Sequence, residues 1–167
     1  SSKGDACVPR PLGGMDGLRV LQVACGAAHS LLLVARRGEG GGEVHAVGEN
    51  SCGQLGLGHT APQPRPRRAT ELCAPGVSRV EAGAASSFAV AAAATRAVGC
   101  NSHGQLGNGR RAAAELRAVR VGGGAGDTAA VARISVHPAT AEARVTLGAR
   151  DGRIARVAIG ARHSLIL

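Results

Sequence analysis

Aromatic side chains are almost missing from this sequence of 167 residues, which contains one Phe and neither Tyr nor Trp. A hydrophobic core must therefore be packed from Val, Leu, Ile and Ala, and each Ala contributes little buried area. Stacking of nucleic-acid bases on a row of aromatic side chains is not expected, because the rings are not there.

Long apolar runs and catalytic motifs are missing as well. The sequence predicts no membrane span, and it contains no nucleophile elbow, P-loop or H-E-x-x-H motif. The histidines show no ligand spacing typical of a metal site. We therefore expect no enzyme activity, no metal and no cofactor.

The cysteines form no C-x-x-C pair, and their number is odd. Both facts argue against a zinc site and against a complete disulfide framework. We expect reduced thiols in an intracellular protein of the cytoplasm or nucleus. The five cysteines are Cys7, Cys25, Cys52, Cys73 and Cys100.

Positive charge is abundant but comes almost entirely from arginine, since Lys3 is the sole lysine and the formal net charge is +9. A basic surface suits an acidic protein or a nucleic acid. A GC-rich genome would also enrich Ala, Gly, Arg and Pro. The charge by itself therefore does not single out nucleic acid or chromatin as the partner.

Internal repeats decide the expected fold. Residues 50–58, N-S-C-G-Q-L-G-L-G, recur as N-S-H-G-Q-L-G-N-G at 101–109. A second motif opens at Val20, Val77 and Ile154, with two apolar residues three apart, a Gly, and then an apolar run. The chain thus holds two full units and the opening half of a third.

Each unit predicts short strands joined by turns. In the first unit we expect strands at 20–25, 29–34 and 43–47, with a loop at 38–42 between the last two. The continuous apolar run of the second strand indicates burial on both faces. In the second unit, residues 92–95 are the expected hairpin tip.

These motifs resemble the regulator of chromosome condensation repeat. The resemblance rests on G-x-x-H-S-L-x-L and V-x-x-V-G-x-N-x-x-G-Q-L-G-x-G, and it covers residues 18–58, 77–109 and 154–167. It implies an all-β fold, a partial β-propeller from a seven-bladed ring of four-stranded blades. The chain departs from the family in having Val47 and Val98 at a usually aromatic position and Ser86 at a usual His.

The expected organisation has five parts. An N-terminal segment or linker covers 1–17, the first blade 18–70, the second blade 71–121, and the start of a third blade 154–167. The repeat period breaks between Arg110 and Arg153, so we expect a Gly/Ala/Arg-rich insertion or loop, at 122–153, between the second and third units. Segments 131–136 and 144–147 are candidates for an extra strand pair in it.

Residues that recur at a fixed phase are expected to hold the fold. Glycines suit turns that need a positive φ, the Asn side chains can bridge their own backbone, and the Gln side chains can satisfy loop backbone groups. The repeated His is expected to be buried and to tie adjacent strands. The set is Gly26, His29, Gly48, Asn50, Gly53, Gln54, Gly56, Gly83, Gly99, Asn101, Gly104, Gln105, Gly107, Gly160 and His163.

Unrepeated residues are the candidates for partner binding. Arg65, Arg67 and Arg68 alternate with prolines in the connection between blades, where they are expected to project from a rim loop. The alternative is a merely solvated basic loop. An acidic protein surface is the first expected target, because arginine pairs with carboxylates through two parallel hydrogen bonds.

The pattern favours a non-enzymatic protein-interaction scaffold. The resemblance implies two alternatives, a guanine-nucleotide exchange factor for a Ran-like small GTPase and the propeller domain of a larger ubiquitin-ligase or kinase chain. Exchange calls for an acidic or wedge-like loop, for which Glu39 and Glu43 are the local candidates. Light sensing by clustered tryptophans, known from a plant member of the family, is not expected without Trp.

Overall fold

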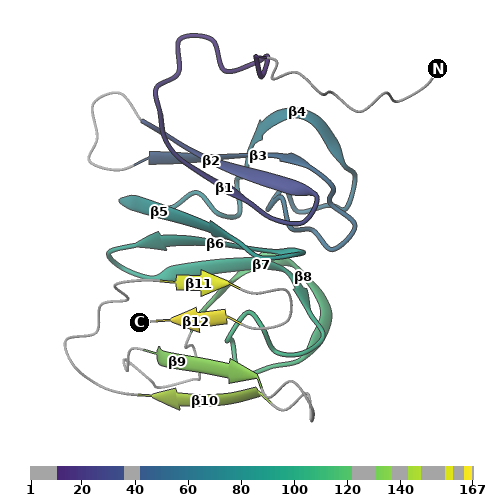
Figure 1. The fold of residues 1–167 in the computed structure, drawn as a ribbon, viewed down its shortest axis with the longest axis vertical. Helices are drawn as coiled ribbons and strands as arrows, with labels where there is room; N and C mark the ends of the chain where they lie inside the picture. Colours follow the sequence, from purple (N-terminus) through teal and green to yellow (C-terminus); the bar gives the residue numbers. More distant parts are fainter. Residues whose placement is uncertain are drawn as a thin grey trace.

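The computed structural model describes residues 11–35 and 42–121, together with the backbone of four later strands. Every element in these described parts is a strand, and no helix occurs among them (Figure 1). The strands form two successive antiparallel four-stranded blades, as the family resemblance implies. The fold is a partial β-propeller whose ring is not closed.

Within each blade the strands pair in chain order, inner strand to outer strand. The first blade contains β1 (Val20–Cys25), β2 (His29–Ala35), β3 (Gly42–Gly48) and β4 (Gln63–Arg68). The second contains β5 (Val77–Ala82), β6 (Ser86–Ala91), β7 (Thr95–Asn101) and β8 (Ala112–Arg120). One strand pairing, Gly42 with Val77, joins the two blades, and the Ala27 N–H donates to the Ala84 carbonyl across the same seam (3.2 Å).

The outer strand of the first blade corrects one sequence expectation. Residues 63–68, expected as a rim loop, form β4, which among the described strands pairs with β3 alone. Pro64 and Pro66 made a loop the better prediction from the sequence, because proline lacks the N–H that a central strand needs. An edge strand tolerates the loss, since its outward backbone groups have no ladder partner.

The outer strand of the second blade, β8, lies within the expected blade at 71–121, but after Arg110, where the repeat period breaks. It pairs with β7 from Asn101↔Ala112 to Arg96↔Arg120. Its sequence, AAAELRAVR, has weak β-propensity and no regular alternation. Pairing with a well-formed neighbour, and not local preference, makes this segment a strand.

Four further strands follow as two antiparallel pairs. β9 (Val131–Val136) pairs with β10 (Ala143–Leu147), close to the expected extra pair. β11 (Val157–Ile159) pairs with β12 (Ser164–Ile166) in the register of an opening third unit. β11 also contacts β5, as β5 contacts β1 in the preceding pair of units. All four strands lie below the second blade in Figure 1.

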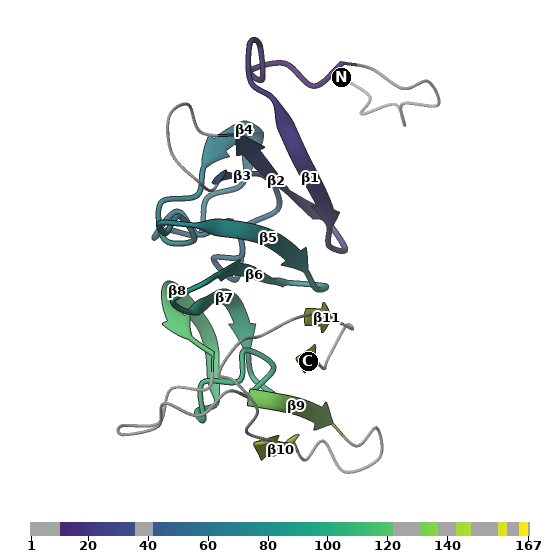
Figure 2. The ribbon, with the colours of Figure 1, turned by 90° about the vertical axis from the view of Figure 1, so that its left-hand side faces the viewer.

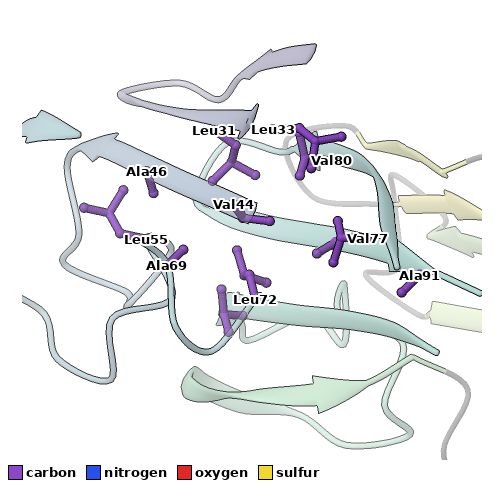
Figure 3. Packing of buried hydrophobic residues seen from close by; sticks show 12 residues of the cluster. Leu31, Leu33, Val44, Ala46, Leu55, Ala69, Leu72, Val77, Val80 and Ala91 are labelled. Carbon is purple, nitrogen blue, oxygen red and sulfur yellow. The ribbon is translucent and has the colours of Figure 1, made fainter. Parts of the chain in front are cut away.

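The hydrophobic core lies between blades as well as within them. Leu31, Leu33, Val44 and Ala46 of the first blade share one buried cluster with Val77 and Val80 of the second (Figure 3). Gln22 adds a polar link, because its side chain donates to Val80 O (2.8 Å) and accepts from Val80 N (3.0 Å). The two inner strands β1 and β5 are thereby held side by side, as Figure 2 shows.

The exposed fraction of equivalent inner-strand residues differs between the two blades. Val77 and Val80 on β5 are 1% and 0% exposed, whereas Val20 and Val23, their counterparts on β1, are 40% and 55% exposed. No described strand covers the β1 valines, while the first blade covers the β5 valines. Burial of the inner strand is therefore a property of the blade pair and not of the single blade.

The repeated turn requires glycine in both blades. Gly53 and Gly104 have φ of 74° and 75°, a left-handed conformation that costs an L-residue with a Cβ roughly 1–2 kcal/mol. Each glycine N–H donates to the carbonyl of the repeated Asn three residues earlier. A Cβ on Gly53 would also overlap the Leu116 side chain of β8.

We predict that Gly104→Ala lowers the free energy of unfolding by about 1 kcal/mol. Gly53→Ala should cost more, because the new methyl group must also displace Leu116. Denaturant unfolding measures both effects. Gly13→Ala is the control, since Gly13 has no positive φ and open space around it. Unfolding free energies equal to that of the Gly13 variant would contradict a strained turn.

Candidate protein-interaction site

A buried polar chain links the two blades near their inner strands. The Ser87 hydroxyl on β6 donates to the Gln54 carbonyl (2.6 Å), so it can accept from the Nε2–H of His29 on β2 (2.8 Å). The buried Nδ1 of His29 then carries the lone pair and has no hydrogen-bond partner. The sequence analysis expected His29 to tie adjacent strands; the structure shows a tie between adjacent blades.

Burial sets the charge state of His29. Loss of hydration lowers the pKa of its imidazole from 6.5 to about 4, because the charged form is penalised in a dry environment. The space for the ring depends on Gly26, where an added Cβ would overlap the imidazole. His29 is therefore a neutral side chain that packs against Gly26 and hydrogen-bonds to Ser87, and its role is structural.

The repeated Asn and Gln side chains hold the turns that follow β3 and β7. Asn50 Oδ1 accepts from Leu55 N (2.9 Å), while its Nδ2 donates to the carbonyls of His59 and Ala61. Gln54 Oε1 accepts from Cys52 N (2.9 Å).

The second blade repeats this pattern. Asn101 accepts from Leu106 N and Gln105 accepts from His103 N. In both blades the buried amides are engaged with their own loop, which leaves little of them to contact a ligand.

The outer strands present a different kind of surface. Arg65 and Arg67 on β4 are exposed, and in the part of the chain that the structure describes neither guanidinium has an ionic partner. Arg117 and Arg120 are exposed on β8, the equivalent strand of the second blade. The structure thus places basic side chains on both outer strands.

Arg68 differs from its two neighbours. Its Nε lies 3.4 Å from Glu43 Oε2, and the same carboxylate is 3.8 Å from His45 Nε2. The register that pairs His45 with Arg68 brings these side chains to the same end of the strand pair. Glu43, a local candidate for an acidic exchange loop, therefore lies on strand β3 and faces an arginine of its own blade.

The described residues hold no group of three His, Cys, Asp or Glu side chains suited to a metal ion. Cys25, Cys52, Cys73 and Cys100 are free thiols; Cys7, Gly160 and His163 lie outside the residues described with side chains. No helix in the described part is long and apolar enough to span a membrane.

The family model of the regulator of chromosome condensation (RCC1) repeat matches residues 41–90, which run from β3 across the blade seam into β6. Residues 41–90 therefore carry an RCC1 repeat. The match spans the joint between the two units, so the blade that the structure forms is offset from the repeat that the family model counts.

Curated relatives are much longer than this chain. It is 38% identical over 109 residues to the probable E3 ubiquitin-protein ligase HERC3 of Homo sapiens, covering 64% of this chain and 10% of that protein. It is 35% identical over 86 residues to the ultraviolet-B receptor UVR8 of Arabidopsis thaliana, covering 52% of this chain and 18% of the receptor. The chain therefore spans only 10% and 18% of the lengths of these two relatives, whose names describe different activities.

Solved structures agree on the fold. Prp20p of Saccharomyces cerevisiae superposes with a TM-score of 0.64 at 21% identity, over 93% of this chain and 30% of Prp20p. Yeast RCC1 (Prp20) bound to Kap60 gives a TM-score of 0.61 at 22% identity, over 90% of this chain and 28% of that one. At these identities the likeness establishes the propeller architecture alone.

The His29 tie predicts a pH dependence of stability. The folded chain holds His29 neutral down to about pH 4, while the unfolded chain protonates it near pH 6.5. The unfolded state therefore binds more protons in this window, and the free energy of unfolding should fall by about 1 kcal/mol per pH unit below 6.5. Below the folded-state pKa this contribution levels off.

His29→Gln tests this expectation, because the amide can still donate to Ser87 but does not titrate. Thermal melts at about pH 7 and about pH 5 should show a smaller acid destabilisation for this variant than for the unmodified chain. His59→Gln, at an exposed ring, should keep the full acid effect. An identical pH dependence in the unmodified chain and His29→Gln would show that His29 is not the responsible group.

Proposed function

We propose that this chain is a non-enzymatic scaffold that captures an acidic protein through the outer strand of its first blade. One observation carries the proposal: the residues that recur at fixed phase are engaged in holding turns and blades, while the unrepeated Arg65 and Arg67 are exposed and have no ionic partner among the described residues. Function on a repeat fold resides in such variable positions.

The chemistry of β4 favours side-chain recognition over strand addition. Pro64 and Pro66 remove two backbone donors, and charged side chains stand between them, a combination that discourages pairing with another strand edge. A guanidinium can form two parallel hydrogen bonds to one carboxylate. Arg65 and Arg67 therefore suit an acidic loop or helix of a partner protein. Arg68 adds a third guanidinium once a carboxylate of the partner replaces Glu43 in its ion pair.

Exchange activity on a small GTPase is the second candidate. Prp20p, whose structure this chain resembles in fold, is described by its binding to Gsp1p and histones. Against exchange stands the Glu43 carboxylate, which lies beside Arg68 and His45 and is not free to displace a metal-bound phosphate. A propeller domain within a larger ubiquitin-ligase chain is compatible with the scaffold. It differs only in the further domains that are attached to the propeller.

The scaffold predicts a specific charge dependence. Arg65→Glu with Arg67→Glu should weaken capture of the partner by at least tenfold in the full-length protein, since removing and reversing charges that pair with carboxylates costs well over 1 kcal/mol. Thermal stability should be unchanged, because both side chains are exposed. Quantitative pull-down from the source cells, followed by affinity measurement on the recovered partner, checks this.

The matched control reverses Arg117 and Arg120, which gives the same net charge on the equivalent strand β8. Capture that is retained by the β8 variant and lost by the β4 variant supports β4 as the site. Equal losses would point to non-specific charge attraction, as would salt-sensitive binding to duplex DNA of similar strength. Accelerated GDP release from a Ran-like GTPase by the full-length protein would replace the scaffold with the exchange factor.

A further inference from the structure

An exposed threonine follows the arginines of β4. Thr70 lies two residues after the end of this strand, in the turn that leads to the second blade. It is exposed, and its hydroxyl has no hydrogen-bond partner within the described residues 11–35 and 42–121. A hydroxyl that holds no part of the fold can be modified without disturbing the packing around it.

Arginines precede Thr70 at three positions. Arg68 and Arg67 stand two and three residues before it, and Arg65 stands five residues before it. No other Ser or Thr of the sequence has arginine at both the second and the third position before it. An arginine-directed protein kinase carries carboxylates in its substrate groove and selects its target hydroxyl by such arginines, because a guanidinium forms two parallel hydrogen bonds with a carboxylate.

The structure presents these arginines for recognition from outside. Arg65 and Arg67 are exposed, and the side chain of Arg68 is 50% exposed. Among the described strands β4 pairs with β3 alone, so its other edge is open. The extended backbone of residues 63–68 spaces the guanidinium groups along the strand, where separate acidic subsites of a kinase can engage them.

The end of β4 is held by few contacts, so that the hydroxyl can reach an active site. Pro64 and Pro66 supply no N–H to the pairing with β3. Ala69 is buried and donates its N–H to Val44 O (2.8 Å), but its side chain is a single methyl group. Local opening of this edge therefore exposes little apolar area and breaks few hydrogen bonds.

We propose that Thr70 is a phosphorylation site for an arginine-directed protein kinase, and that the phosphate switches off the basic surface of β4. The modification site stands on the exposed hydroxyl and on the arginines before it. The switch rests on the function proposed above, the capture of an acidic protein by Arg65 and Arg67.

The reaction consumes ATP as its phosphoryl donor. The Thr70 hydroxyl oxygen attacks the γ-phosphorus of magnesium ATP, and the bond from this phosphorus to the oxygen shared with the β-phosphate breaks. ADP leaves with that oxygen, and the hydroxyl proton passes to the carboxylate base of the kinase. The chain therefore exchanges one neutral hydroxyl for a phosphate monoester.

The phosphate acts on the arginines nearest to it. It carries a charge of about −1.5 to −2 at neutral pH and three strong acceptor oxygens. Arg67 lies about 10 Å along extended backbone from Thr70, and Arg68, where the phosphate competes with Glu43, is nearer. The carboxylate of Glu71 is occupied by a hydrogen bond from the backbone of β8 (3.0 Å). Pairing with the phosphate therefore withdraws two guanidinium groups from an acidic partner.

The first experiment incubates the full-length protein with the catalytic subunit of cyclic-AMP-dependent protein kinase and magnesium ATP, and maps the phosphopeptides. We expect phosphate on Thr70, and Thr70→Ala should lose it. Thr60→Ala is the control and should be phosphorylated on Thr70 at the unmodified rate, since Thr60 is exposed but follows no arginine within five residues. A chain without phosphate on Thr70 would overturn the site.

Two double substitutions test the role of the arginines. Arg67→Ala with Arg68→Ala should lower kcat/KM for phosphorylation of Thr70 about a hundredfold, because two charge-assisted contacts with the kinase are lost. Arg117→Ala with Arg120→Ala removes the same charge from β8 and should leave kcat/KM unchanged. Equal values for the two double variants would show that the kinase does not recognise the arginines of β4.

Binding of a fluorescent polyglutamate peptide tests the switch. Phosphorylation should weaken binding about tenfold, phosphatase treatment should restore it, and kinase-treated Thr70→Ala should bind like the untreated chain. Unchanged binding by the phosphorylated chain would overturn the switch but not the modification site. If Arg65→Glu with Arg67→Glu binds the peptide as tightly as the unmodified chain, the proposed function is overturned instead, while the phosphopeptide map still decides the site.

Discussion

Packing of one blade against the next is the interaction on which the rest of the structure depends. A four-stranded blade has an apolar face that it cannot bury alone, so each repeat needs a neighbour. The contrast between Val80 and Val23, equivalent residues with opposite exposure, shows this directly. The scarcity of aromatic residues makes the requirement stricter, because a core of Val, Leu and Ala gains free energy only if many small side chains are excluded from water together.

Polar groups at the seam follow from the same requirement. Close approach of the blades buries turns whose backbone N–H groups lack ladder partners, and each unsatisfied group would cost free energy. Asn50 and Gln54 supply the missing acceptors, and His29 links Ser87 to the neighbouring blade. The repeated polar residues are therefore a consequence of blade packing, which explains why they recur at fixed phase and why a neutral imidazole is tolerated in a dry environment.

The outer strands escape these constraints and can carry function. Arg65 and Arg67 on β4 and Arg117 and Arg120 on β8 are exposed, so these arginines are accommodated at little cost to the fold. The basic, proline-containing sequence at 62–68 predicted an exposed segment, and Arg65 and Arg67 are exposed on an edge strand, where charge and proline are both tolerated. It did not indicate a strand, and only the equivalence of β4 and β8 in space singles out Arg117 and Arg120 within the basic stretch that follows Arg110.

The sequence by itself determined the blade, because turn glycines and strand alternation are local and recur at fixed intervals: β1, β2, β3 and the positive φ of Gly53 could all be predicted from them. Only the tertiary structure decided that β4 and β8 are strands, since proline and alanine carry no β signal and their pairing comes from neighbours. The hydrogen bond between His29 and Ser87 belongs to the same class. It crosses between two repeats, and no spacing within one repeat encodes the angle at which blades pack.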